Sequence, residues 1–151
     1  MKKQVTAVKG GIAQDQRGQI RFVNDFDMKQ IRRFYLIANR DTELTRGWRG
    51  HRREQRWLYA VSGSFSVDLV VIDDWERPSR DTPIETWVLK HADQQVLCIP
   101  SGWAMAFRAL QPDSEMLVFA DHLIEDAESD DYTWPLDYFR LNDMSQREWF
   151  K

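Results

Sequence analysis

Short apolar runs separated by turn residues occupy most of the chain. Each run is too short for an amphipathic helix, and several alternate between apolar and polar positions, as a strand does when one face is buried. The runs predict strands at 19–26, 31–39, 55–72, 84–90, 95–100, 103–110 and 115–124. Many short strands at this spacing are typical of an antiparallel β-sandwich that closes toward a barrel. We therefore expect an all-β fold.

The alternation is clearest in the second half of the 55–72 run. Phe65, Val67, Leu69 and Val71 alternate with Ser66, Asp68 and other residues, so the four apolar side chains share one face. The run is interrupted by Ser62-Gly63-Ser64. Because glycine adopts positive φ at no steric cost, this tripeptide predicts a tight hairpin turn between two strands.

The strand at 103–110 follows a Pro-x-Gly turn, Pro100 to Gly102. Its alternation places Trp103, Met105 and Phe107 on the inward face. The segment 137–150 differs, since the spacing of Leu141 and Met144 suits one face of a helix. We expect a short C-terminal helix there, within a single domain over residues 1–151.

Composition narrows the function classes. The net charge is −3 and the pI about 5.6, whereas a nucleic-acid-binding chain would carry a basic excess. No apolar run approaches the length of a membrane span, and the N-terminus lacks a signal-peptide core. The single cysteine, Cys98, allows no disulfide within the chain and reads as a buried apolar side chain. These features predict a cytoplasmic protein without nucleic-acid or membrane partners.

The stretch RGWRGHRREQ, residues 46–55, carries the candidate chemistry. One histidine, His51, stands among four arginines. A histidine titrates near neutrality and can act as a general acid or base, and guanidinium groups bind phosphates. A solvated charged turn would also explain the cluster. Within an acidic chain, a small anionic ligand fits this local cluster better than a polymer does.

The stretch RGWRGHRREQRWLYAVSG, followed some 40 residues later by PSGWAM, resembles the two motifs of the cupin superfamily. In metal-binding cupins the first motif supplies His-x-His and a glutamate, and the second supplies a histidine. Here Arg49 and Met105 stand at two of the histidine positions, and Glu54 lies two residues nearer than the spacing requires. With His51 alone, too few donors remain for a divalent ion. We therefore expect no metal and no other cofactor.

The sequence resembles one branch more closely, the sugar 3,4-ketoisomerases that act on dTDP-4-keto-6-deoxyglucose, related to the dTDP-4-dehydrorhamnose 3,5-epimerases. IRRFYLI parallels I-K-R-x-Y-Y-I, RGWRGHR parallels R-G-x-H-A-H-K, and IPSGW and VFAD parallel later segments. The resemblance covers roughly residues 10–139. It implies a cupin (RmlC-like) double-stranded β-helix, or jelly-roll barrel. It also implies a metal-independent isomerase or epimerase of a dTDP-4-keto-6-deoxyhexose, in cell-surface polysaccharide synthesis, and a homodimer.

Four positions depart from the pattern of this branch. Arg49 replaces the first histidine, Leu36 the second tyrosine, Arg56 a glutamine, and Ile124 a late tyrosine, with His122 nearby. These departures leave a second hypothesis open: a catalytically inactive cupin that binds a nucleotide sugar or a related anion.

The resemblance and the chemistry of the residues assign candidate roles. We expect His51 to be the acid or base and Tyr35 to donate a proton or a hydrogen bond to the sugar oxygen. The expected substrate-binding residues are Arg33, Arg46, Arg49, Arg56, Trp103 and Phe107. Each has a plainer alternative: a surface imidazole for His51, core packing for Tyr35 and the two other aromatic residues, and ion pairing or solvation for the arginines.

Overall fold

The structure, a computed structural model, describes residues 3–139. Strands dominate it, with one short helix, α1 (Ile124–Ala127), and two 3-10 turns, η1 (His91–Asp93) and η2 (Glu128–Asp130). The strands are β1 Thr6–Lys9, β2 Gly11–Asp15, β3 Gly18–Phe22, β4 Arg33–Ala38, β5 Arg46–His51, β6 Arg56–Ser62, β7 Ser64–Val71, β8 Glu85–Lys90, β9 Gln95–Ile99, β10 Trp103–Ala109, β11 Glu115–Ala120 and β12 Tyr132–Thr133.

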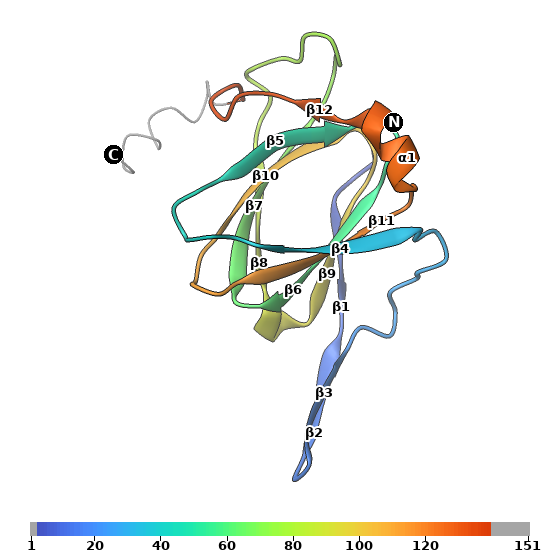
Figure 1. The fold of residues 1–151 in the computed structure, drawn as a ribbon, viewed down its shortest axis with the longest axis vertical. Helices are drawn as coiled ribbons and strands as arrows, with labels where there is room; N and C mark the ends of the chain where they lie inside the picture. The colour runs from blue at the N-terminus through green and yellow to red at the C-terminus, as the bar shows by residue number, and fades with distance from the viewer. Residues whose placement is uncertain (1–2, 140–151) are drawn as a thin grey trace.

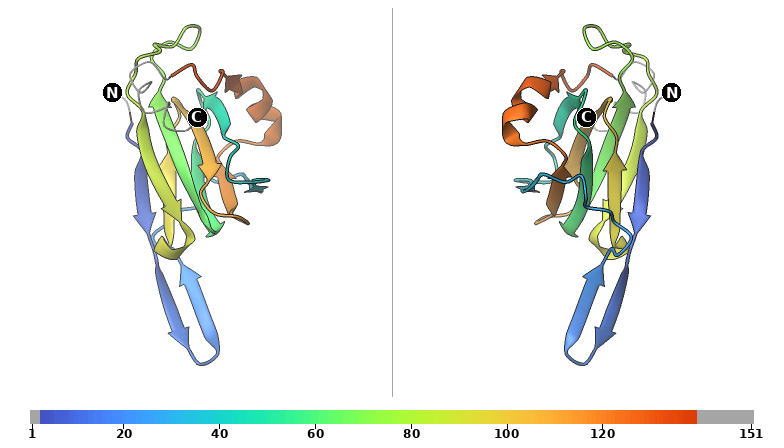
Figure 2. Two further views of the ribbon diagram at one scale, coloured as in Figure 1. Left: turned by 90° about the vertical axis from the view of Figure 1, so that its left-hand side faces the viewer. Right: turned by 90° about the vertical axis from the view of Figure 1, so that its right-hand side faces the viewer.

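Two five-stranded antiparallel sheets face each other and form the body of the molecule (Figures 1 and 2). One has the order β1-β9-β6-β11-β4 and the other β12-β5-β10-β7-β8. A separate hairpin, β2–β3, projects away from the body (Figure 2). The predicted all-β jelly-roll barrel is confirmed.

The core lies between the sheets. Phe65, Val67 and Leu69 point inward from β7, as the alternation predicts, and pack against residues of the opposite sheet such as Leu58 and Val118. The three inward residues predicted on β10 belong to the same core. Each fully buried side chain of this size contributes about 1.5–3 kcal/mol. The periodicity of two therefore sets both the strands and the face that each strand buries.

The turn at Ser62-Gly63-Ser64 differs from the prediction. Gly63 has a φ of +68°, as expected, but β6 and β7 belong to different sheets. The chain therefore turns a corner between the two layers rather than forming a hairpin. A run interrupted by glycine indicates a sharp turn, but it does not tell whether the second strand pairs with the first.

Replacing Gly63 with alanine is expected to lower the free energy of unfolding by at least about 1–2 kcal/mol, the cost of left-handed backbone for an L-residue. A Cβ there would also lie 2.0 Å from Ser114 Oγ. Urea unfolding measures the loss. Gly102→Ala is the matched control, because φ is +95° there and no atom lies within 4 Å. Equal losses in both variants would show that the contact with Ser114 does not matter.

Other segments also differ from the sequence-based prediction. Residues 46–51 lie outside every predicted strand, yet they form β5, which lies between β12 and β10. The sequence does not indicate this strand because most of its residues are arginine or glycine, although Trp48, Gly50 and His51 are buried. Of the strand predicted over 115–124, β11 ends at Ala120, residues 121–123 are irregular, and Ile124 begins α1. Of the helix predicted at 137–150, residues 137–139 form a turn, and the rest lies outside the described residues.

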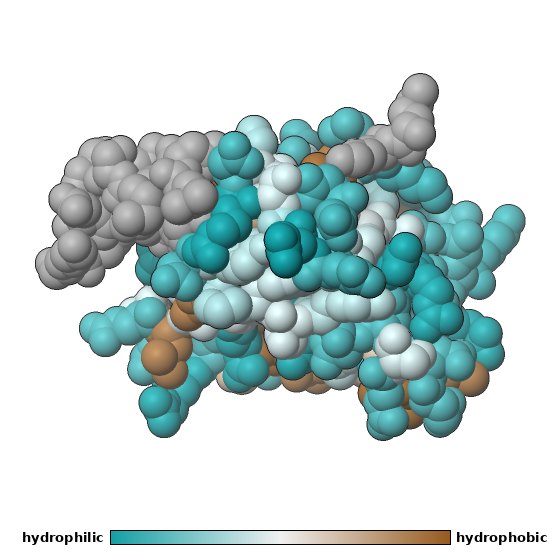
Figure 3. Space-filling view, turned by 90° about the horizontal axis from the view of Figure 1, so that it is seen from above, coloured by the Kyte–Doolittle hydropathy of each residue, from teal (hydrophilic) through white to brown (hydrophobic). Residues whose placement is uncertain are grey.

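The end of the barrel that carries α1 and the 73–83 loop is largely hydrophilic on its surface (Figure 3). Within residues 3–139, no helix is long and apolar enough to cross a membrane.

Candidate active site

A cleft opens beside β4, β5 and β6, between the barrel interior and the α1–η2 segment. It consists of two adjoining cavities of about 430 and 490 Å³. Both are lined by Tyr35, Arg49 and Arg56. The inner cavity is further lined by Ile37, Arg46, Gly47, Trp48, Met105, Phe107 and Thr133. The outer cavity is further lined by Arg33, Phe34, His51, Ile124, Ala127, Glu128 and Asp131.

His51, the last residue of β5, is buried in the wall of the outer cavity. Its Nδ1 lies 2.9 Å from the main-chain oxygen of Asp130. A carbonyl oxygen can only accept, so Nδ1 carries the proton. Nε2 is then an acceptor, and it is buried without a hydrogen-bond partner among the described residues. Unpaired buried polar atoms are rare in folded proteins and often mark chemistry. Nε2 is therefore a buried, unpaired acceptor on a residue that lines the outer cavity.

Burial, together with the positive charge of Arg56, lowers the pKa of His51 below its ordinary value of 6.5. The Asp130 carbonyl and the charges of Glu54 and Asp130 act in the opposite direction and do not cancel the effect. The imidazole is therefore neutral at pH 7, as a general base must be.

The lowered pKa of His51 predicts a pH-dependent stability. In the folded protein His51 stays neutral at pH values where the unfolded chain already binds a proton, so the unfolded state is favoured as pH falls below 6.5. The melting temperature of the wild type should fall more steeply between about pH 8 and about pH 5 than that of H51N. Thermal unfolding followed by circular dichroism measures it. Parallel curves for the two proteins would contradict the burial of a neutral imidazole.

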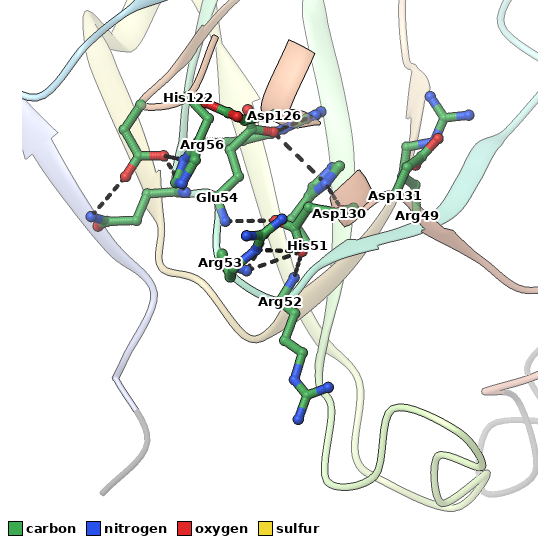
Figure 4. A network of polar contacts seen from close by, with 12 residues as sticks. Arg49, His51, Arg52, Arg53, Glu54, Arg56, His122, Asp126, Asp130 and Asp131 are labelled. Carbon is green, nitrogen blue, oxygen red and sulfur yellow. Dashed lines mark hydrogen bonds and ion pairs between the residues drawn. The ribbon is translucent and has the colours of Figure 1, made fainter. Parts of the chain in front are cut away.

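Asp130 fixes the turn that follows His51 (Figure 4). Its buried carboxylate accepts hydrogen bonds from the main-chain N–H groups of Arg52, Arg53 and Glu54, at 2.8–3.2 Å. The same residue therefore holds the turn with its side chain and the His51 tautomer with its main chain. Hydrogen bonds to a charged acceptor contribute about 1.5–3 kcal/mol each.

Glu54 is fully buried and receives two guanidinium groups. Its Oε1 accepts from Arg33 Nη2 at 2.9 Å, and its Oε2 accepts from Arg56 Nε and Nη2 at 2.9 and 2.8 Å. Oε2 also lies 3.7 Å from His51 Nδ1. In the sequence analysis, Glu54 is considered only as a glutamate displaced from the metal-ligand position of the cupin motif. The structure makes it the carboxylate that neutralises part of the charge beside the candidate base.

The other predicted arginines lie in the cleft in different states. Arg33 lines the outer cavity, with its Nε on the His122 carbonyl at 3.0 Å. Arg49 forms a 3.0 Å ion pair with Asp131, and both side chains are about half exposed. Arg46 lines the inner cavity and donates to Asn39 Oδ1 at 3.0 Å.

Of the two aromatic residues predicted to contact a ligand, Phe107 lines the cleft and Trp103 does not. Phe107 lies in the core and reaches the wall of the inner cavity, beside Met105. Trp103 lines neither cavity: it is buried in the core, and its indole N–H donates to the Lys3 carbonyl. Trp103 is the first residue of β10, two residues before Met105, and its contact with a ligand stays a prediction. Cys98 is only half-buried, and burial raises the pKa of its thiol.

The two former histidine positions of the cupin motifs face each other. Arg49 on β5 pairs in register with Met105 on β10, and both line the inner cavity. Within residues 3–139, no three histidine, cysteine, aspartate or glutamate side chains gather in a way that could hold a metal ion. Neither a guanidinium nor a thioether suits the hard divalent ions that such a site would hold.

Two facing antiparallel sheets with a cleft lined by the β5 motif define a cupin barrel of the RmlC type. The chain belongs to the family described as FdtA: WxcM-like, C-terminal, whose model matches residues 3–142. The resemblance predicted from the sequence is thus confirmed. No curated protein matches the chain.

Solved structures share the fold. A variant of the 3,4-ketoisomerase QdtA from Thermoanaerobacterium thermosaccharolyticum, in complex with TDP-4-keto-6-deoxyglucose, is 20% identical over 100% of both chains, with a TM-score of 0.67. A 3,4-ketoisomerase from Helicobacter canadensis is 18% identical over 92% of this chain and 98% of that one, with a TM-score of 0.68. The dTDP-4-dehydrorhamnose 3,5-epimerase from Bacillus anthracis is 13% identical over 88% and 79%, with a TM-score of 0.70.

Proposed function

We propose that this protein is an isomerase of a dTDP-4-keto-6-deoxyhexose, of the 3,4-ketoisomerase type, which works without a metal ion. The observation that carries the proposal is the unpartnered Nε2 of His51, buried in the wall of a cleft that Tyr35 and several arginines share. The solved structures of similar fold support the substrate class, because they are named as ketoisomerases and epimerases of TDP-linked keto sugars.

The proposed reaction moves two protons and needs no oxidant. His51 Nε2 removes the proton on C3, next to the C4 carbonyl, and the C–H electron pair forms a C3=C4 double bond while the carbonyl pair moves to O4. The O3 proton passes to O4. The C3 carbonyl then forms as C4 takes the proton from Nε2. One base on one face of the sugar suffices, which favours ketoisomerisation over inversion at a carbon.

The diphosphate of the nucleotide has a suitable partner in Arg46. Arg49 is paired with Asp131, and Arg33 and Arg56 are paired with Glu54, whereas Arg46 has a neutral partner, Asn39. An arginine without a carboxylate partner can give its donors to phosphate oxygens at the smallest cost. We propose Arg46 as the principal diphosphate contact and the apolar inner wall, with Phe107, as the neighbouring surface.

Proton NMR of dTDP-4-keto-6-deoxyglucose in D2O with the protein tests the proposal. We expect loss of the C3 proton signal and the growth of a new keto sugar, since the proton on Nε2 exchanges with solvent during turnover. Loss of the C5 proton as well would indicate an epimerase instead. An unchanged spectrum at high protein concentration would overturn the proposed activity.

One observation favours the second candidate, a cupin that binds the nucleotide sugar without turning it over. Arg49 stands where the resemblance places an imidazole, and it is engaged with Asp131. In the same NMR experiment this candidate predicts broadened thymine resonances with an unchanged sugar.

We also propose a homodimer in the cytoplasm, acting in polysaccharide sugar synthesis. β4 is an edge strand of its sheet and exposes Phe34 and Leu36, which are 65% and 52% accessible. Exposed apolar side chains along an unpaired strand edge favour pairing with another chain. Light scattering of the wild type and of Leu36→Asp tests it: a monomeric wild type would refute the dimer.

A further inference from the structure

We propose that Arg56 is a catalytic residue: with Tyr35 it binds the sugar oxygen on which negative charge develops, and the buried Glu54 is the positioning residue that aims it. This inference rests on the proposed function and extends it. The resemblance places a glutamine at position 56 and assigns no role to Glu54, so the assignment follows from the geometry of these three side chains.

Glu54 sets the direction of the Arg56 guanidinium. Arg56 Nε and Nη2 both donate to Glu54 Oε2, which fixes one edge of the planar group. The remaining nitrogen, Nη1, lies 2.6 Å from Tyr35 Oη. Arg33 holds the other oxygen of the same carboxylate. The Arg56 side chain is 11% exposed and, like Tyr35, lines both cavities, so the pair borders the space that a ligand would occupy.

The contact with Arg56 leaves the hydroxyl hydrogen of Tyr35 unused. Arginine has no acceptor, so in the short contact Arg56 donates and the phenol oxygen accepts. The phenolic O–H of Tyr35 is then available to a ligand in either cavity, since Tyr35 lines both. A neighbouring cation polarises the phenol and strengthens it as a donor. Tyr35 and Arg56 thus form one electropositive pair.

The Tyr35–Arg56 pair and the candidate base, His51, line the same cavity. His51, Tyr35 and Arg56 all line the outer cavity. An enolate requires a base at carbon and a donor at the adjacent oxygen at the same time, and a fixed donor in a water-poor site stabilises the developing charge without reorganising. A glutamine at position 56 would supply a hydrogen bond but no charge. Arg56 therefore adds to this wall a positive charge that a glutamine would lack.

The buried carboxylate is what allows this cation to be buried. An unpaired guanidinium at this depth would carry a large desolvation cost, which a hydrogen-bonded partner offsets. The charges that act on the His51 pKa are those of Arg56, Glu54 and Asp130, and Arg33, Arg49, Glu128 and Asp131 line the same cavity. Changing Arg56 should therefore alter both the donor pair and the titration of the base.

Steady-state kinetics of Arg56→Gln, Arg56→Lys and Tyr35→Phe test the proposal. For Arg56→Gln we expect kcat to fall by about 100-fold, the effect of losing one such donor, with little change in KM. The acidic limb of its kcat/KM profile should move to higher pH, because the charge that lowers the His51 pKa is gone. Arg56→Lys should keep the acidic limb near that of the wild type. Tyr35→Phe should lower kcat without moving the limb.

Each outcome decides the inference. Arg56→Gln leaves Glu54 paired with Arg33, which helps the variant fold, and circular dichroism confirms it. A folded Arg56→Gln with wild-type kcat and an unmoved acidic limb would overturn the catalytic role, and so would a loss seen only in melting temperature. If the wild type itself shows no turnover, the proposed function fails first. Turnover in the wild type with full activity in Arg56→Gln would remove this inference alone.

Discussion

Replacing His51 with asparagine is expected to lower kcat by about 10²–10⁴-fold, the usual contribution of a general base. Asparagine keeps a hydrogen-bonding group near the Asp130 carbonyl that now accepts from Nδ1, but it supplies no basic nitrogen in place of Nε2. The Kd for TDP should change little, because the proposed diphosphate contact is Arg46. Loss of the C3 proton signal in D2O, followed by NMR, measures the rate.

The matched control is His91→Asn. His91 lies in η1 with an exposed side chain, and it lines neither cavity of the cleft. Its replacement should leave the exchange rate at the wild-type value. Full activity in His51→Asn would show that another group removes the proton, and would withdraw His51 from the mechanism.

Replacing Glu54 with leucine should lower the free energy of unfolding by about 3–5 kcal/mol. The change removes the only carboxylate that contacts both Arg33 and Arg56 within residues 3–139, and their side chains are 18% and 11% exposed. Two guanidinium groups would then stay buried without a counter-charge. Urea unfolding gives the loss, provided that the slope of the transition is unchanged.

Glu43→Gln controls for the removal of a negative charge, because Glu43 is exposed. It should alter the free energy of unfolding by no more than about 0.5 kcal/mol. A Glu54→Leu variant as stable as this control would mean that Arg33 and Arg56 find water or other partners without cost. The role of Glu54 in positioning Arg56 would then lack its physical basis.

The strands that the sequence predicts well are those whose large apolar side chains share one face. On β7 the alternation of apolar and polar residues identifies the strand and its inward side chains Phe65, Val67 and Leu69. On β10, which is buried on both faces, large apolar side chains alternate with alanines, and this alternation identifies the inward face. Alternation of apolar and polar residues does not identify β5, because the buried positions of this strand include Gly50 and His51 and its exposed positions include two arginines. It also fails at Gly63, because pairing between strands depends on contacts distant in sequence.

The site follows a similar division. His51, Tyr35, Arg46, Arg49 and Arg56 were predicted on motif grounds, and the structure brings all five into one cleft. The acidic residues that organise them were missed. Asp130 and Asp131 lie some 80 positions from their partners, in a segment without a periodic pattern, and only the folded chain brings them to β5. The sequence offers one indication of these acidic residues: the cluster of arginines at 46–56 needs carboxylate partners in the folded protein.

Asp130 orients the base through its main-chain carbonyl, which every amino acid possesses. The direction of Nε2 therefore does not depend on the side chains of Ile124 and Glu128 in the same segment. Ile124 and Glu128, which face the ligand space from the wall of the outer cavity, can be exchanged for residues that suit another sugar while Nε2 keeps its direction. Under the proposed function, recognition and catalysis would rest on different parts of this wall, so a redesign of specificity should begin at Ile124 and Glu128 and leave Asp130 unchanged.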